Sequence, residues 1–386
     1  MSGIKSILHQ RIKFNRNELS GAFGDIGTDL PLIIGMLLAS DLQVTNVLLV
    51  FGAMQILTGF VYGIPMAVQP LKAVAMIVIT QQVSGNMILM SGLLIGVIMF
   101  ALSASNLLNF VEKYIPKTVI RGIQLGLGIQ LALIGLKDYV PAEAVSGYVL
   151  AGISFFIAII FIGNRKYPPA IFIILLGFVY SITFNFNQGF MQPMQPVFQL
   201  PELNTDDLWS AFFLLTLPQI PLSLGNSIFA TKQVAKDLFP EKNIGVKKIG
   251  LTYSIMNISS PFLGGIPVCH GSGGLAGQFT FGGRTGGSVI IYGILYILLG
   301  LFFSTNFTEI TKIFPLPVLG VILMLEGTAL IVLVKDIITD KKQFLIAVVI
   351  ALIAIGIPYG YFVGMVVGII MYYLSNKIFL KHYGKQ

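Results

Sequence analysis

Long apolar stretches, separated by short polar breaks, follow one another along almost the whole chain. A helix needs about 20 apolar residues to span a bilayer, and most of these stretches approach that length. The pattern predicts an all-α polytopic membrane protein with fourteen transmembrane segments. The first seven are expected at residues 18–39, 44–62, 65–82, 87–107, 118–136, 145–162 and 168–184, and the last seven at residues 207–230, 249–263, 267–281, 288–304, 315–334, 344–357 and 359–375.

Composition agrees with a membrane protein and excludes several other classes. Of 386 residues, 55% are hydrophobic and 10% are charged, whereas ordinary globular domains are about 25% charged. A soluble enzyme, a disordered chain and a disulfide scaffold are therefore excluded. The single cysteine, Cys269, excludes an internal disulfide and a cysteine-cluster metal site. We expect neither a cleavable signal peptide, because residues 1–17 are polar and basic, nor a soluble C-terminal domain.

The basic residues predict the orientation in the membrane. With a cytoplasmic N-terminus, alternating segments place all but four of the 24 Lys and Arg residues in or beside cytoplasmic stretches. The outer loop at residues 185–206 has neither Lys nor Arg. The positive-inside rule then predicts a multi-pass protein of the cell membrane with both termini in the cytoplasm. The net charge of +8 is interpreted as a sign of topology, and no nucleic-acid surface is expected.

The chain also contains a weak internal repeat. The triplet Gly-Ile-Pro at 63–65 recurs at 265–267, and Gly-Asp at 24–25 corresponds to Gly-Asn at 225–226. Because each half contains an odd number of segments, the second half would insert upside down relative to the first. Inverted repeats of this kind are typical of secondary transporters, in which paired broken segments point to the binding site. The two repeats are expected at residues 1–185 and 207–386.

The third and tenth segments are short and interrupted. Pro65 and Pro70 exclude a continuous helix, and Pro70 is expected as the first residue of a half-helix. The tenth segment has the same plan, with an extended piece before a glycine-rich helix start. Helix N-termini bind anions, and each acts as roughly +0.5 charge. Together with Lys72, two facing N-termini would offer about +2, which suits a dianion. The alternative is that the glycines only let helices cross closely.

Polar residues inside the membrane complete the candidate site, since such residues are commonly functional. The carboxylates of Asp25 and Asp29 share one helix face, and a carboxylate that gains a proton beside an anion would produce proton symport. The alternative is a structural Asp–Lys pair. His270 could instead cap the tenth segment, and Gln219 and Asn226 could only bond neighbouring helices. The expected substrate-binding residues are Gln69, Lys72, His270, Gly271, Ser272, Gly273, Gly274, Asp25, Thr28, Asn226 and Gln219, and the coupling candidates are Asp25, Asp29 and Glu326.

Four stretches resemble the signatures of a known family. They are residues 21–32 (GAFGDIGTDLPL), 68–73 (VQPLKA), 218–227 (PQIPLSLGNS) and 269–287, which begins CHGSGGLAGQ. In order and spacing they resemble the molybdate transporter family, relatives of the sulfate permeases that share a fold with nucleobase permeases. The resemblance implies a seven-plus-seven inverted repeat, with a core domain of segments 1–4 and 8–11 that moves like an elevator against a gate domain of segments 5–7 and 12–14.

The expected function is secondary active import of molybdate, without catalytic residues, metal ligands or cofactors. A sulfate transporter of the same fold and an anion channel stay open as alternatives. A nucleobase permease would carry carboxylates on segments 8 and 10, where this chain has Gln, Asn, His and Ser. An intramembrane aspartyl protease would need glycine at Ala22. The expected partners are a small oxyanion and the lipid bilayer, and a homodimer is one open arrangement.

Overall fold

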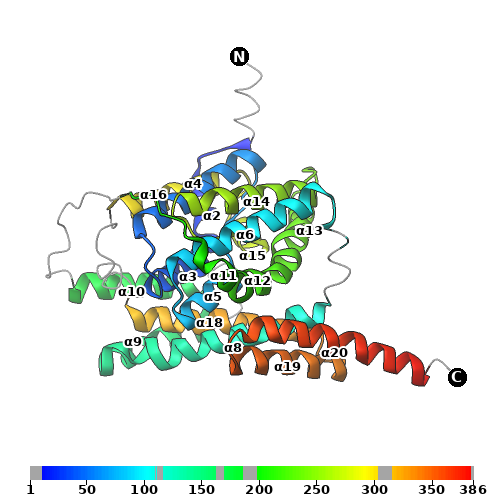
Figure 1. Cartoon of the computed structure of the whole chain (residues 1–386). Helices are drawn as coiled ribbons and strands as arrows, with labels where there is room; N and C mark the ends of the chain where they lie inside the picture. Colours follow the sequence, from blue (N-terminus) through cyan, green and yellow to red (C-terminus); the bar gives the residue numbers. More distant parts are fainter. Residues whose placement is uncertain are drawn as a thin grey trace, which may run out of the picture.

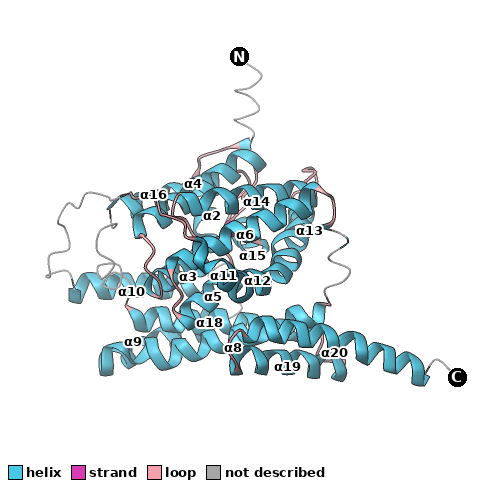
Figure 2. Ribbon diagram, viewed as in Figure 1, coloured by secondary structure: helices cyan, strands magenta, loops and turns pink. Residues whose placement is uncertain are grey.

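The structure is a computed structural model that describes residues 11–108, 110, 116–161, 169–185, 198–302 and 315–383. In these ranges the regular elements are helices, apart from two three-residue strands (Figure 2). Within the described ranges, six helical stretches are long and apolar enough to cross a membrane, which supports a multi-pass membrane protein, and four shorter apolar helices accompany them. The count of fourteen segments stays a prediction. The six stretches are Arg16–Leu38, Val44–Tyr62, Gly85–Ala104, Lys117–Phe161, Thr205–Leu238 and Leu316–Asp336.

The helices lie in two groups, one above the other in Figure 1. The upper group contains α2 (Arg16–Ala22), α3 (Ile26–Leu38), α4 (Val44–Tyr62), α5 (Lys72–Gln81), α6 (Gly85–Ala104), α11 (Leu208–Ala211), α12 (Leu217–Leu222), α13 (Thr231–Leu238), α14 (Val246–Phe262), α15 (Ser272–Thr280) and α16 (Gly287–Phe302). The lower group contains α8 (Lys117–Ile134), α9 (Ala144–Phe161), α10 (Pro169–Asn185), α18 (Leu316–Val332), α19 (Lys341–Gly356) and α20 (Gly360–Tyr383). Irregular helical turns join them: η1 (Phe23–Asp25), η2 (Gly135–Tyr139), η3 (Val140–Glu143), η5 (Thr205–Asp207), η6 (Phe212–Thr216), η7 (Ser223–Ala230) and η8 (Leu333–Asp336).

Long helices within each group pack through glycines. In the upper group α16 lies along α4 and α14 along α6, and in the lower group α8 packs against α18 and α19. A Cβ added at Gly52 or at Gly293 would lie 2.5 Å from the carbonyl oxygen of the other residue, and the same holds for Gly128 and Gly327. These helices therefore touch backbone to backbone, as membrane helices commonly do where both carry small residues.

The interrupted third and tenth segments form a two-stranded antiparallel ladder. Strand β1 (Val68–Pro70) pairs with β2 (Val268–His270), and Gln69 lies opposite Cys269. The prediction that Pro70 begins the half-helix is wrong, because Pro70 ends β1 and α5 begins two residues later. The next residue still belongs to the ladder, since the N–H of Leu71 donates to the carbonyl oxygen of Pro267 over 3.0 Å.

Each strand is held at its first residue by a side-chain amide. Gln55 of α4 donates to the carbonyl oxygen of Val68 over 2.7 Å and accepts from its N–H over 3.1 Å. Asn257 of α14 does the same at Val268, over 2.6 Å and 2.9 Å. Buried backbone groups of a short ladder need such partners, so the two amides fix both strands inside the helix bundle.

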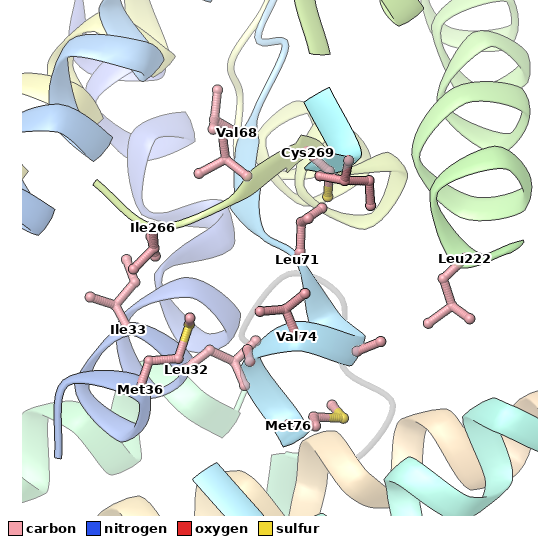
Figure 3. Packing of buried hydrophobic residues seen from close by; sticks show 14 of the residues in the cluster. Leu32, Ile33, Met36, Val68, Leu71, Val74, Met76, Leu222, Ile266 and Cys269 are labelled. Carbon is pink, nitrogen blue, oxygen red and sulfur yellow. The ribbon is translucent and has the colours of Figure 1, made fainter. Parts of the chain in front are cut away.

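A buried apolar layer supports the ladder. Leu32, Ile33 and Met36 of α3 are fully buried beside α5 and the two strands (Figure 3). By contrast, large apolar side chains on the outside of α9 and α19, such as Phe156 and Leu352, are exposed. Apolar residues on both sides of these helices suit a protein whose outer surface meets lipid.

The buried carboxylate of Glu18, on α2, contacts the start of α16. Glu18 is 2% exposed, and its carboxylate accepts hydrogen bonds from the N–H groups of Arg284, Thr285 and Ser288 over 3.1, 3.0 and 3.1 Å. A carboxylate is stabilised at a helix N-terminus by the helix dipole and by unpaired N–H groups. Glu18 therefore anchors α2 to α16 inside the upper group.

Candidate anion-binding site

Asp25 lies at the break in the first segment, where η1 passes into α3, and it is 4% exposed. The side-chain amide of Gln69, on β1, donates to both carboxylate oxygens over 2.7 and 2.9 Å. A Cβ added at Gly274 would lie 2.1 Å from Oδ2 of Asp25. Asp25 therefore sits between the ladder and the first turn of α15, and the glycine makes room for it.

The N-terminus of α5 is occupied by a side chain from the upper group. Oε1 of Gln219, on α12, accepts from the N–H groups of Ala73 and Val74 over 2.9 and 3.3 Å. Its amide nitrogen donates to Ser223 over 3.1 Å, and Ser223 bonds Tyr253 over 2.7 Å. A neutral carbonyl oxygen thus lies where two backbone donors of a helix N-terminus point.

The N-terminus of α15 is built from glycines that have two different surroundings. Gly271 is the residue before the helix and makes no side-chain cap, while Ser272 donates to Oδ1 of Asn226 over 3.3 Å. A Cβ at Gly271 would lie 2.0 Å from Oε1 of Gln69, but a Cβ at Gly273 would meet no atom within 4 Å. Gly271 and Gly274 therefore allow close approach of Gln69 and Asp25, and Gly273 borders open space.

A small cavity lies beside these elements. Its volume is about 50 Å³. Three of the predicted site residues line it: Lys72 on the first turn of α5, Gln219 on α12 and Asn226 on η7. Among the described residues that line this cavity, Lys72 is the charged one. The full lining is Lys72, Gln124, Gln219, Leu222, Asn226, Ser227, Cys269, Leu330 and Leu333.

The imidazole of His270 lies away from this cavity. Consecutive strand residues point to opposite faces, and Cys269 is the one that faces the cavity. Nε2 of His270 bonds Thr252 of α14 over 2.7 Å, and the ring packs edge-on against Tyr62. In this structure His270 therefore connects β2 to α14 and α4, and a direct contact with a ligand in the cavity would need the ring to move.

The remaining predicted residues lie on two helices. Asp29 is fully buried on α3, and Thr28 lies one residue before it and is partly buried. Glu326 lies on α18, and its side chain is outside the described residues. Among the described residues, no three His, Cys, Asp or Glu side chains come together in a way that could hold a metal ion.

The site elements fall inside a match to known proteins. The family model described as "Molybdate transporter of MFS superfamily" matches residues 17–131 and 211–330, more than half of the chain. The chain belongs to this molybdate transporter family. A relative from Arabidopsis thaliana, "Molybdate transporter 1", is 30% identical, over 95% of this chain and 89% of its own length. The residues that line the small cavity all fall within the matched ranges, except Leu333.

Two solved structures share the fold of this chain. The transmembrane domain of a cyanobacterium bicarbonate transporter, BicA, matches with a TM-score of 0.67 and 18% identity, over 93% of this chain and 98% of that chain. The murine anion transporter Slc26a9 in its inward-facing state matches with a TM-score of 0.70 and 14% identity, over 97% of this chain and 70% of that chain. At these identities the similarity establishes the fold alone.

Six residues of the small cavity were not predicted from the sequence, and three of them carry a polar group or a thiol: Gln124, Ser227 and Cys269. Gln124 is a polar residue within an apolar segment, which is a signal that sequence reasoning can use. Ser227 follows a predicted residue directly. Cys269 gives no such signal, because only the strand register shows which of two neighbours faces the cavity.

Proposed function

We propose that this protein is a secondary active transporter that imports molybdate, bound between the N-termini of α5 and α15. The observation that supports this most is the lining of the small cavity. It combines Lys72, three side-chain amides and a hydroxyl with the start of a helix, and no Asp or Glu lines it among the described residues. Such a lining supplies many hydrogen-bond donors and positive charge, which a tetrahedral dianion needs.

Binding at this site would replace one set of hydrogen bonds by another. The N–H groups of Ala73 and Val74 already donate to Gln219, so an oxyanion that takes these donors must displace its carbonyl oxygen. The amide group can then turn its NH₂ toward the anion. Lys72 and the N-terminus of α5 supply about +1.5 charge at the cavity, and the N-terminus of α15 is proposed to add about +0.5, which together would balance molybdate.

The proposed architecture has fourteen segments in two inverted repeats, with both termini in the cytoplasm. Matched local features support it, since Gln55 and Asn257 hold their strands in the same way. We take the upper helix group as the core domain and the lower group as the gate domain. The small cavity has walls from both groups, because Gln124, Leu330 and Leu333 belong to the lower one. An elevator motion of the core would carry the bound anion past these residues.

Proton coupling is proposed to use Asp25 or Asp29. Both carboxyl groups are buried in the upper group, and Asp25 contacts Gln69 and the first turn of α15. A dianion nearby disfavours the ionised form of a carboxyl group. A proton taken up with the anion would lower this repulsion and would leave with the anion on the other side.

The test is uptake of radiolabelled molybdate into proteoliposomes, with sulfate as competitor. Lys72→Ala should weaken molybdate binding at least tenfold, about 1.4 kcal/mol, whereas Lys232→Ala, at an exposed position on α13, should bind as the parent does. Full inhibition by equimolar sulfate would favour a sulfate transporter. An anion conductance without accumulation would favour a channel. Molybdate uptake that survives Lys72→Ala unchanged would refute the proposed site.

A further inference from the structure

A second, larger cavity adjoins the small one. Its volume is about 510 Å³, and its walls come from α8 and η8 of the lower group and from α12 and η7 of the upper group. Gln124, Asn226 and Leu333 line both cavities. At its other end the large cavity reaches Lys117, whose side chain is 60% exposed. The large cavity therefore lies between the small cavity and the surface at the start of α8, and it shares walls with the small one.

Two cations on one face of α8 line the large cavity. Lys117 and Arg121 are the charged residues among its described lining. Both pair with a single carboxylate oxygen, Oδ2 of Asp336, which lies 2.9 Å from Nζ of Lys117 and bonds Nη2 of Arg121. Asp336 itself does not line the cavity. The cluster of three residues thus keeps one net positive charge, and the cations, not the carboxylate, face the cavity.

Arg121 has hydrogen-bonding capacity that these contacts do not use. Its side chain is 16% exposed, and Nη1 donates to Gln124, which lines both cavities, over 2.8 Å. The Nε–H group is buried and has no hydrogen-bond partner in the described part of the chain. Buried N–H groups are normally bonded, and exceptions in native proteins frequently mark a functional role.

The position of the two cations is unfavourable unless an anion is present. Lys117 is the first residue of α8, and no side chain in the described ranges caps this N-terminus. The helix dipole places partial positive charge there, so it repels cations in the first turn. Asp336 compensates for one of the two cations only. A positive cluster at a helix N-terminus on the wall of a cavity matches an anionic ligand better than it matches a structural ion pair.

We propose that Lys117 and Arg121 form a second binding site for a tetrahedral dianion, and that Asp336 competes with the dianion for these two cations. The proposal rests on the proposed function, because it takes the small cavity as the primary site. A dianion that leaves the small cavity past Gln124 next meets the guanidinium of Arg121, whose planar fork suits an oxyanion. The Asp336 carboxylate then pairs with the two cations again. This competition keeps the affinity of the second site low, so that the dianion dissociates.

The test is equilibrium dialysis of the purified full-length chain with radiolabelled molybdate and, separately, with radiolabelled sulfate. Asp336→Asn should tighten the weaker site at least tenfold, or reveal one additional bound dianion per chain. Adding Lys117→Gln and Arg121→Gln to this variant should remove the gain. Asp340→Asn is the matched control, because Asp340 is an exposed N-cap of α19 and asparagine caps helices equally well.

The outcomes separate this proposal from the proposed function. If Lys72→Ala removes the tight site and Asp336→Asn still strengthens the weak one, both stand. If Lys72→Ala changes nothing but Asp336→Asn adds a site, the second site stands and the primary site fails. Equal binding of both ions by the parent and by folded Asp336→Asn overturns the second site. Should Asp336→Asn not fold, Arg121→Gln alone must remove the weak site and spare the tight one, and any other result overturns the proposal.

Discussion

Gly274→Ala should damage the protein far more than the same change at Gly273. The two glycines are neighbours in the first turn of α15. A Cβ at Gly274 would lie 2.1 Å from Oδ2 of Asp25 and 2.7 Å from the Cβ of Ala67. The methyl group of Ala67 cannot rotate away, and Asp25 must move by roughly 1.5 Å to reach ordinary contact distance. A shift of that size breaks the two hydrogen bonds from Gln69 to the carboxylate.

The expected size of the effect follows from those bonds. A hydrogen bond to a charged group contributes about 1.5–3 kcal/mol, and forced overpacking costs about 1–3 kcal/mol more. With both bonds broken, and with about 1 kcal/mol regained in helix propensity, we expect Gly274→Ala to lower the free energy of unfolding by at least about 3 kcal/mol and molybdate affinity at least tenfold. Gly273→Ala gains the same helix propensity, about 1 kcal/mol, and its new methyl group meets no atom within 4 Å.

Both variants would be compared with the parent in detergent. Denaturant unfolding measures stability, and equilibrium dialysis with molybdate measures affinity. The reasoning fails if Gly274→Ala unfolds and binds as the parent does. It also fails if Gly273→Ala lowers the free energy of unfolding equally, because the contact with Asp25 would then not be the cause of the lost stability.

Three further results are expected. Glu18→Gln should lower the free energy of unfolding by about 2 kcal/mol, because the new amide group cannot accept from Ser288 as the carboxylate does; exposed Glu241→Gln is the control, and equal denaturation midpoints for the two variants would contradict the role of Glu18. On a cysteine-free background, a membrane-impermeant thiol reagent should label Glu202→Cys from outside the cell and Lys242→Cys only after permeabilisation, and the reverse pattern would invert the proposed topology. An inwardly directed proton gradient should raise the initial rate of molybdate uptake by the parent and should leave either Asp25→Asn or Asp29→Asn unaffected; uptake by the parent that ignores the gradient would exclude proton coupling.

The sequence predicts the broken segments well, because their cause is local. Pro65 and Pro70 exclude a continuous helix wherever they occur, and the structure has an extended stretch there. The start of α5 was wrong by two residues because it depends on a distant partner. The N–H of Leu71 is bound by Pro267, nearly 200 positions later, and no local pattern reports such a bond.

The candidate site was predicted less completely, for a related reason. For the two aspartates the sequence offered proton coupling or a structural Asp–Lys pair, and it did not predict that the side-chain amide of Gln69, on another element, donates to both carboxylate oxygens of Asp25. The direction of a strand side chain depends on register, so the sequence could not show that Cys269 faces the cavity while His270 faces α14. The residue types therefore indicated which kinds of side chain lie near the site, but the direction in which each side chain points could be known only from the fold.

The hydrogen bonds of Gln219 at the N-terminus of α5 have a consequence for the step of a transport cycle in which the empty carrier returns. A carrier that delivers its cargo must move back across the membrane without it, and a bare helix N-terminus in apolar surroundings would make that step unfavourable, because an unsatisfied buried donor costs about 1–3 kcal/mol. The amide oxygen of Gln219 satisfies Ala73 and Val74 when no anion does. In the proposed carrier cycle, the unloaded protein would therefore need no replacement anion at α5 for its return, and net accumulation would not have to be an exchange of one anion for another.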